Sequence, residues 1–235
     1  MIPVIILLVL FSNNLLTQDI HYSQFEKTRS IVNPSLIFDQ ETDYELQLQR
    51  RSQWYSVTRP FNTFSLSLNA KNAYKSTSIG TTIINDIAGD SRFSTQGISV
   101  SASKKFSKKE DFFSFGMQLG FYQRGVIFDD LIFLENEQLK NLRFSFFDIG
   151  FGVSNYKKIN NNSMILTGIS AYHLNQPKQS LTGEENIFLA QKYVIHSVYT
   201  SKLKNNIDVS PVVYYSKQNI EQEFIIGTSF LYKFN

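Results

Sequence analysis

The chain of 235 residues contains no cysteine. This absence excludes a disulfide framework, a thiolate metal site and a cysteine nucleophile. Charged residues are also scarce, at 18% of the sequence, and the formal net charge is only +3. A charge this small gives no basis for binding nucleic acid, so no nucleic-acid partner is expected. The mean hydropathy of −0.18 excludes a bundle of transmembrane helices.

Histidine is scarce too, with only His21, His173 and His196 in the chain. No two of them have the spacing of a metal-binding motif. Ser197 follows His196, but neighbours on a strand point to opposite faces, so these two cannot pair as nucleophile and base. We therefore predict no catalytic residue, no metal site and no cofactor, and we expect a protein that is not an enzyme. His173 is interpreted as a residue at the end of a strand, at a membrane interface.

Long apolar runs are absent except at the N-terminus, where residues 2–11 read "IPVIILLVLF". This run has the length of a signal-peptide core and is too short to span a bilayer as a helix. No Lys or Arg precedes it, and no A-x-A pattern follows it. The interpretation is a signal peptide over residues 1–17, and the alternative is a buried strand or helix at the start of the chain.

Aromatic residues, in contrast, are abundant, with 21 Phe and 12 Tyr, and they recur with a period of two. In "FFSFGMQLGF" (112–121), Phe and other apolar residues alternate with Ser, Gly and Gln. Helical spacing would not produce this alternation, so such segments predict strands. About ten strands are expected, near residues 43–54, 61–71, 76–85, 95–106, 112–124, 144–157, 163–174, 192–203, 207–217 and 221–234.

Two all-β architectures fit these strands, a soluble sandwich or barrel and a barrel of the outer membrane. Strands of about ten residues suit a tilted crossing of a bilayer. The face opposite the apolar one carries Ser, Gly, Asn, Gln and Thr rather than Lys and Glu, which favours a polar lumen and a lipid-facing exterior. We therefore predict an antiparallel outer-membrane β-barrel over residues 41–235, preceded by a periplasmic or plug-like segment over 18–40. Five tyrosines are expected to form interfacial girdles: Tyr122, Tyr156, Tyr172, Tyr199 and Tyr215.

Several segments, in order, resemble a known family. They are "QDIHYSQF" (18–25), "VNPSL" (32–36), "RRSQWYSV" (50–57), "PFNTFSLSL" (60–68), "IGTTIINDIAG" (79–89), "FGMQLGFYQRGVIFDDLIF" (115–133) and "GISAYHLNQPKQSL" (168–181). Together they are similar to the motifs of the PorP/SprF family of type IX secretion system membrane proteins. The family-motif positions, with a structural or partner-binding role, are Asn33, Pro34, Arg51, Trp54, Asn85, Asp86, Gly116, Gly120, Asp129, His173 and Pro177.

The resemblance implies a non-enzymatic outer-membrane barrel of the type IX secretion and gliding apparatus. It further implies that the protein helps to export or anchor a large cell-surface adhesin. The implied partners are outer-membrane lipid, the C-terminal domain of the adhesin, and periplasmic components of the apparatus. The barrel pattern alone leaves an alternative function, that of a general porin or a transporter of hydrophobic solutes. Pro177, which has no N–H to donate, is expected to end strand pairing after residue 174.

The C-terminal end leaves two alternatives open. "FIIGTSFLYKFN" (224–235) resembles the closing strand of outer-membrane barrels, and it also resembles an internal strand of the family. Family members usually continue with further strands after the region that matches residues 192–234. The chain is therefore either a short member that closes with about ten strands or a truncated part of a larger barrel.

Overall fold

Ten antiparallel strands form a single curled sheet in which each strand pairs with its neighbours in chain order. The computed structural model describes residues 28–40, 42–53, 60–89, 93–108, 110–126, 141–180, 187–204 and 207–232. The strands are β1 (Tyr44–Gln53), β2 (Phe61–Tyr74), β3 (Thr77–Ala88), β4 (Phe93–Lys108), β5 (Asp111–Val126), β6 (Leu142–Asn160), β7 (Ser163–Tyr172), β8 (Lys192–Lys204), β9 (Ile207–Gln218) and β10 (Glu221–Tyr232). The prediction of about ten antiparallel strands is confirmed.

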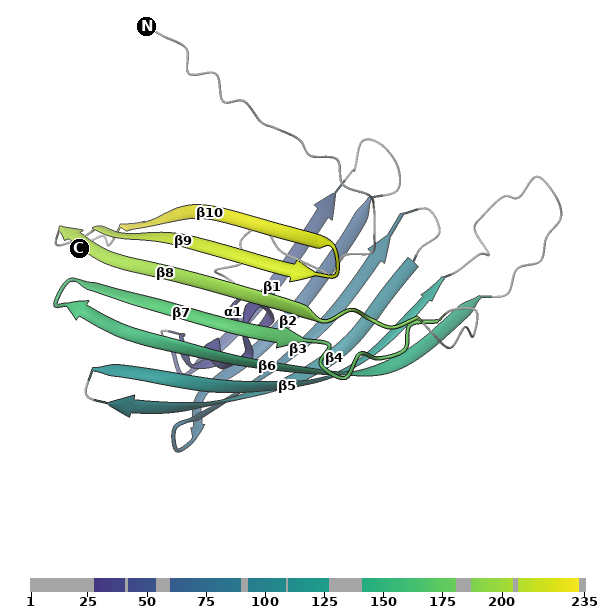
Figure 1. Ribbon diagram of the computed structural model, residues 1–235, viewed down its shortest axis with the longest axis horizontal. Helices are drawn as coiled ribbons and strands as arrows, with labels where there is room; N and C mark the ends of the chain where they lie inside the picture. The colour runs from purple at the N-terminus through teal and green to yellow at the C-terminus, as the bar shows by residue number, and fades with distance from the viewer. Residues whose placement is uncertain are drawn as a thin grey trace, which may run out of the picture.

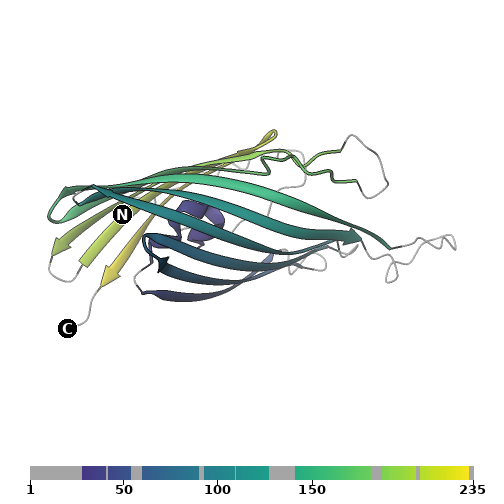
Figure 2. The same ribbon diagram turned by 90° about the horizontal axis from the view of Figure 1, so that it is seen from below.

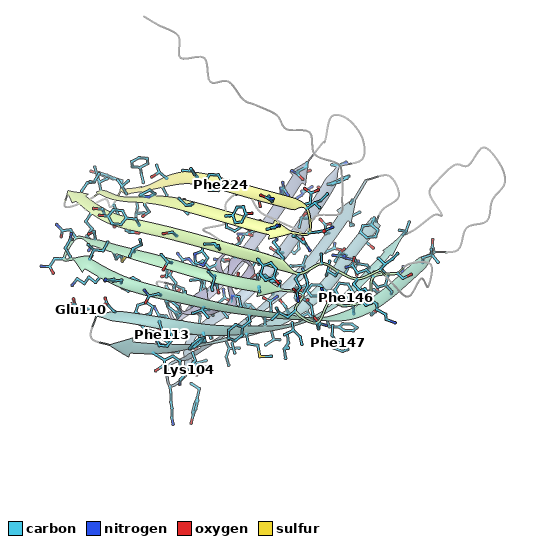
Figure 3. All side chains as sticks on the ribbon, viewed as in Figure 1. Lys104, Glu110, Phe113, Phe146, Phe147 and Phe224 are labelled. Atoms are coloured by element: carbon cyan, nitrogen blue, oxygen red, sulfur yellow. The ribbon has the colours of Figure 1, made fainter. Side chains whose placement is uncertain are left out.

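The period of two separates the side chains onto a convex and a concave face. Phe146 and Phe147 are neighbours on β6, yet Phe146 is 7% exposed and Phe147 is 70% exposed. Figure 3 labels both residues on this strand. The apolar members of each alternation lie on the convex face, as Leu46, Leu68 and Leu119 do, and remain exposed. A continuous exposed apolar face of this kind suits contact with lipid.

The concave face is lined by small polar side chains. Ser65, Ser67 and Asn69 of β2 are buried there, as are Ser99 and Ser101 of β4. Some of these groups pair across strands, for example Ser67 Oγ with Thr82 Oγ1 at 3.0 Å. The concave face therefore has the composition of a polar lumen.

If the convex face contacts lipid, a charged side chain there should lower the free energy of unfolding more in the middle of a strand than near its end. Leu119 and Gln123 both point outward on β5, Leu119 near the middle and Gln123 close to the end. We expect Leu119→Arg to lower the free energy of unfolding by about 2–4 kcal/mol and Gln123→Arg to lower it by about 0–1 kcal/mol. Denaturant unfolding in phospholipid vesicles measures both values. Equal losses at the two positions would contradict a membrane-facing convex surface.

The connections differ between the two ends of the sheet. At one end, two-residue connections join strands at 75–76, 109–110, 161–162 and 205–206. At the other end, the connections 54–60, 89–92, 127–141 and 173–191 are longer, and 219–220 is a two-residue turn. Among the described residues, β1 pairs only with β2 and β10 pairs only with β9, so the curl is an open half-barrel.

A short N-terminal segment lies on the concave side of the curl, as Figures 1 and 2 show. It contains α1 (Arg29–Val32) and the 3-10 helix η2 (Pro34–Phe38). The η2 turn contacts strands β2 to β6, and all five of its residues are buried. We call residues 28–40 the lumenal segment.

The prediction of tyrosine girdles is wrong for three of the five residues. Tyr122, Tyr156 and Tyr172 lie on the concave face, and Tyr172 is only 6% exposed. Each has the same strand parity as a polar or glycine neighbour two residues away, such as Gly120, Ser154 and Ser170. Strand parity therefore places these rings inside the curl rather than at the lipid interface.

Candidate functional site

The lumenal segment turns sharply at Asn33 because this residue caps η2. The Asn33 side chain accepts a hydrogen bond from the Ser35 backbone N–H at 2.9 Å, and Pro34 occupies the first position of the turn. Asparagine is a favoured N-cap, and proline suits the first position because no N–H is needed there. The sequence Asn-Pro-Ser thus specifies a compact turn.

Asn33 also attaches the segment to the wall of the lumen. Its Nδ2 donates to the carbonyl oxygens of Val153 on β6 at 3.2 Å and Ile169 on β7 at 3.1 Å. Nδ2 lies 3.1 Å from Nε2 of His196 on β8 as well. The Asn33 side chain is 0% exposed. One buried amide therefore joins the segment to three consecutive strands.

The hydrogen bonds fix the orientation of this amide and the tautomer of the histidine. Asn33 Oδ1 faces two donors of Ser35, the backbone N–H and the hydroxyl, the latter at 2.7 Å. Its Nδ2 must therefore face the carbonyls and His196. An amide NH₂ has two hydrogens and no acceptor, so Nδ2 shares its two hydrogens among the two carbonyls and His196, and a neutral His196 faces it with an unprotonated Nε2.

Glycines make room for the turn on the wall. A Cβ atom at Gly116 would meet the backbone of Pro34 and Ser35 within 3.0 Å, and one at Gly152 would meet Asn33 Oδ1 equally closely. These two glycines face each other in the β5–β6 register. On β7, a Cβ at Gly168 would collide with the His196 ring. We call Gly116, Gly152 and Gly168 the glycine cradle.

Both ends of the turn pack against further parts of the wall. Ser170 Oγ donates to the Val32 carbonyl at 2.7 Å, and Val32 packs in a buried cluster with Val194 and Tyr214. After the turn, the Phe38 ring meets Phe112 edge-on, with ring centroids 4.8 Å apart. The segment is thus held at the cradle and on both sides of it.

A second buried polar pair lies where β7 ends. His173 Nδ1 donates to Asp148 Oδ1 on β6 at 2.7 Å, and both residues are buried. His173 has a φ of 57°, a left-handed conformation that breaks the strand. The prediction of an interfacial His173 is therefore wrong, because the side chain turns into the lumen to reach Asp148. The strand also ends at Tyr172, before Pro177, so His173 and not Pro177 ends it.

No metal-ligand cluster of three or more His, Asp or Glu residues occurs in the described part of the chain. Within the same residues, no helix has the length and apolar character needed to cross a membrane. The site therefore consists of hydrogen bonds and close packing between a short segment and a strand wall.

Comparison with known families identifies the chain. Residues 14–235 match the profile of a family described as type IX secretion system membrane protein PorP/SprF. The chain belongs to the PorP/SprF family. Among solved structures, the translocator domain of the autotransporter NalP from Neisseria meningitidis aligns with a TM-score of 0.40 at 10% identity, covering 89% of this chain and 95% of that chain. No curated protein matches the chain.

The structure brings together only some of the PorP/SprF motif positions. Asn33, Pro34 and Gly116 meet in the cradle. Asp86 of β3 lies away from the cradle. Its Oδ1 accepts a hydrogen bond from Thr63 Oγ1 at 2.6 Å, and Arg51 is an electrostatic neighbour.

The remaining motif positions also lie outside the cradle. Asn85 lies beside Asp86 on β3, and Gly120 lies against the Tyr122 ring. The Pro177 carbonyl accepts a hydrogen bond from the Leu189 N–H at 2.9 Å. Trp54 and Asp129 lie outside the described residues.

Sequence reasoning did not select His196, Gly152 or Gly168, and His196 is the most distant of these from Asn33 along the chain. It has no motif spacing to another histidine, and its contact with Asn33 spans 163 positions of the chain. One signal for it was present, since His196 and Val194 share the parity of the lumenal face on β8. Gly168 lies opposite His196 in the register, and its lack of a side chain leaves room for the imidazole ring.

Proposed function

We propose that this protein is a non-enzymatic outer-membrane component of the type IX secretion and gliding apparatus. In this role it helps to export or anchor a large cell-surface adhesin by holding the C-terminal domain of the adhesin and linking it to periplasmic components. Membership of the PorP/SprF family and the exposed apolar face of the curled sheet support this proposal.

The connections of the sheet suggest how the protein is oriented. Outer-membrane barrels have short turns on the periplasmic side and longer loops outside. The two-residue connections at 75–76, 109–110, 161–162 and 205–206 would then face the periplasm and its machinery. The longer connections 127–141 and 173–191 would face the cell exterior, where the adhesin is displayed.

The observation that carries the proposal is the occupied lumen. Asn33 and the glycine cradle hold a buried segment against the wall, and Leu36 and Phe38 pack in a core cluster with Leu166. A segment that occupies part of the lumen obstructs the flow of solute, which suits an anchor better than an open pore. The polar lumen by itself favours the alternative function, a general porin or hydrophobic-solute transporter.

Two measurements on the full chain separate these functions. The tagged protein is extracted from its native outer membrane with detergent, and co-purified proteins are identified by mass spectrometry, with an unrelated tagged barrel as control. We expect a large surface adhesin and type IX components with this protein and neither with the control. In planar bilayers we expect no steady open-channel current. A steady current without these partners would support the porin and contradict the anchor.

A further inference from the structure

Strand β6 runs past the end of β7 at the end of the sheet that carries the long connections, as Figure 1 shows. Pairing between β6 and β7 stops at Phe151 and Ala171, whereas pairing between β5 and β6 continues to Val126 and Leu142. The outer part of β6, residues 142–149, is therefore paired along one side only. We call this stretch the β6 overhang.

Asn175 ends the pairing on the β7 side of β6 by standing in for the next strand. Its Oδ1 accepts from the Ile149 N–H at 3.2 Å, and its Nδ2 donates to the Phe147 carbonyl at 2.7 Å. The backbone groups of every second residue in a strand point to the same side. The N–H and C=O groups of Arg143, Ser145 and Phe147 therefore all point away from β5.

Beyond the Asn175 amide this edge of β6 is free. No residue in the described part of the chain bonds to the Phe147 N–H, or to the N–H and C=O groups of Ser145 and Arg143. The described part of the connection 173–191 forms a bridge within itself rather than with β6. Arg143, Ser145 and Phe147 are all exposed. A row of unpaired donors and acceptors of this kind is a template for pairing with another strand.

The side chains of the β6 overhang indicate which strand would fit. Phe147 is 70% exposed, and its ring centroid lies 5.1 Å from that of Phe121 on β5. Arg143 lies on the same face and forms no ion pair with any described residue. Side chains directly opposite each other on neighbouring strands interact, and opposite charges there are favourable. A strand with an apolar residue opposite Phe147 and an acidic residue opposite Arg143 is therefore complementary to the overhang.

We propose that the β6 overhang binds an extended segment of a partner protein, which adds to the sheet as one further strand. Backbone hydrogen bonds give such a contact its affinity, and the side chains at alternate positions give it specificity. This inference rests on the proposed function, under which the overhang faces the cell exterior and the exported protein supplies the segment. Lipid tails cannot take this place, because they offer no partner to backbone groups.

The test repeats the co-purification from the native outer membrane with variants of the full chain. Ser145→Pro removes an N–H that would donate to the partner, and proline is tolerated where the N–H of an edge strand faces outward. Ser145→Ala is the matched control, because it keeps that N–H. Arg143→Glu leaves the backbone unchanged and reverses the charge. Quantitative mass spectrometry gives the amounts of adhesin and of periplasmic components per tagged protein.

We expect the recovered adhesin to fall roughly tenfold or more in Ser145→Pro and roughly fivefold in Arg143→Glu, and to stay unchanged in Ser145→Ala. The periplasmic components should be recovered equally with all variants. Undiminished adhesin in both Ser145→Pro and Arg143→Glu would overturn the inference and leave the proposed function intact. Absence of adhesin with the unsubstituted protein would contradict the proposed function instead.

Amide hydrogen exchange tests the strand addition whatever the identity of the partner. In the full chain refolded alone into lipid nanodiscs, the amides of Arg143, Ser145 and Phe147 are expected to exchange fast, because they are exposed and unpaired. In the complex extracted from the native outer membrane, the same amides should exchange at least about tenfold more slowly. Equal exchange in the two samples would overturn the inference.

Discussion

The Gly116→Ala variant is expected to lose about 2–3 kcal/mol of unfolding free energy, although it adds only one methyl group. The new Cβ would lie within 3.0 Å of backbone atoms of Pro34 and Ser35. A backbone cannot rotate away from a clash as a flexible side chain can. Either β5 or the lumenal segment must therefore shift, and the hydrogen bonds of Asn33 shift with it. Denaturant unfolding in phospholipid vesicles measures the loss.

Gly227→Ala on β10 is the matched control for this experiment. A Cβ at Gly227 meets only Val212 Cγ1, at 3.4 Å, which is ordinary contact. Alanine at that position is expected to change stability by no more than about 0.5 kcal/mol, since alanine restricts the unfolded chain more than glycine does. Equal losses in the two variants would show that the cradle does not hold the segment.

Asn33→Ala is expected to lower the free energy of unfolding by about 2–4 kcal/mol, because it removes a cap and leaves buried groups without partners. His196 Nε2 and the Ser35 donors lose their partner, and the Val153 and Ile169 carbonyls each lose one accepted hydrogen bond. Asn33→Asp separates the two contributions, because it keeps an acceptor for Ser35 but cannot donate to the wall. At pH 8, where histidine is ordinarily neutral, the aspartate variant should be no more stable than the alanine variant.

Asn62→Ala on β2 is the control, since among the described residues the Asn62 amide donates to the Pro60 carbonyl alone, two residues away. Its loss should stay below about 1 kcal/mol. If Asn33→Asp were as stable as the unsubstituted protein, the cap alone would explain Asn33 and the attachment to the wall would be wrong.

The strands were predictable because strand periodicity is a local property of the sequence. The alternation in residues 112–121 identifies β5 without any knowledge of its neighbours, and the structure extends it to Asp111–Val126. The placement of tyrosines was predictable by the same rule. Tyr122 shares the parity of Gly120, but its assignment to a girdle was based on residue type and overlooked that parity.

The site was only partly predictable because its contacts are not local. Asn33, Pro34 and Gly116 were selected through a family resemblance, and the structure shows what they share. The bonds from Asn33 to Val153 and Ile169 span 120 and 136 positions. No spacing rule reports such a separation, and the roles of Gly152 and His196 follow only once the sheet register is known.

Residues 28–40 lie on the lumenal wall, against strands β2 to β8. Because the chain has no cysteine, a disulfide between introduced cysteines tests this placement directly. Ser170 Oγ bonds the Val32 carbonyl, so the pair Val32→Cys and Ser170→Cys should cross-link in the membranes of intact cells. Val32→Cys with Met164→Cys should not, because Met164 lies six residues along β7, roughly 20 Å from Ser170. Cross-linking of the second pair, or failure of the first in a folded protein, would contradict the seated segment.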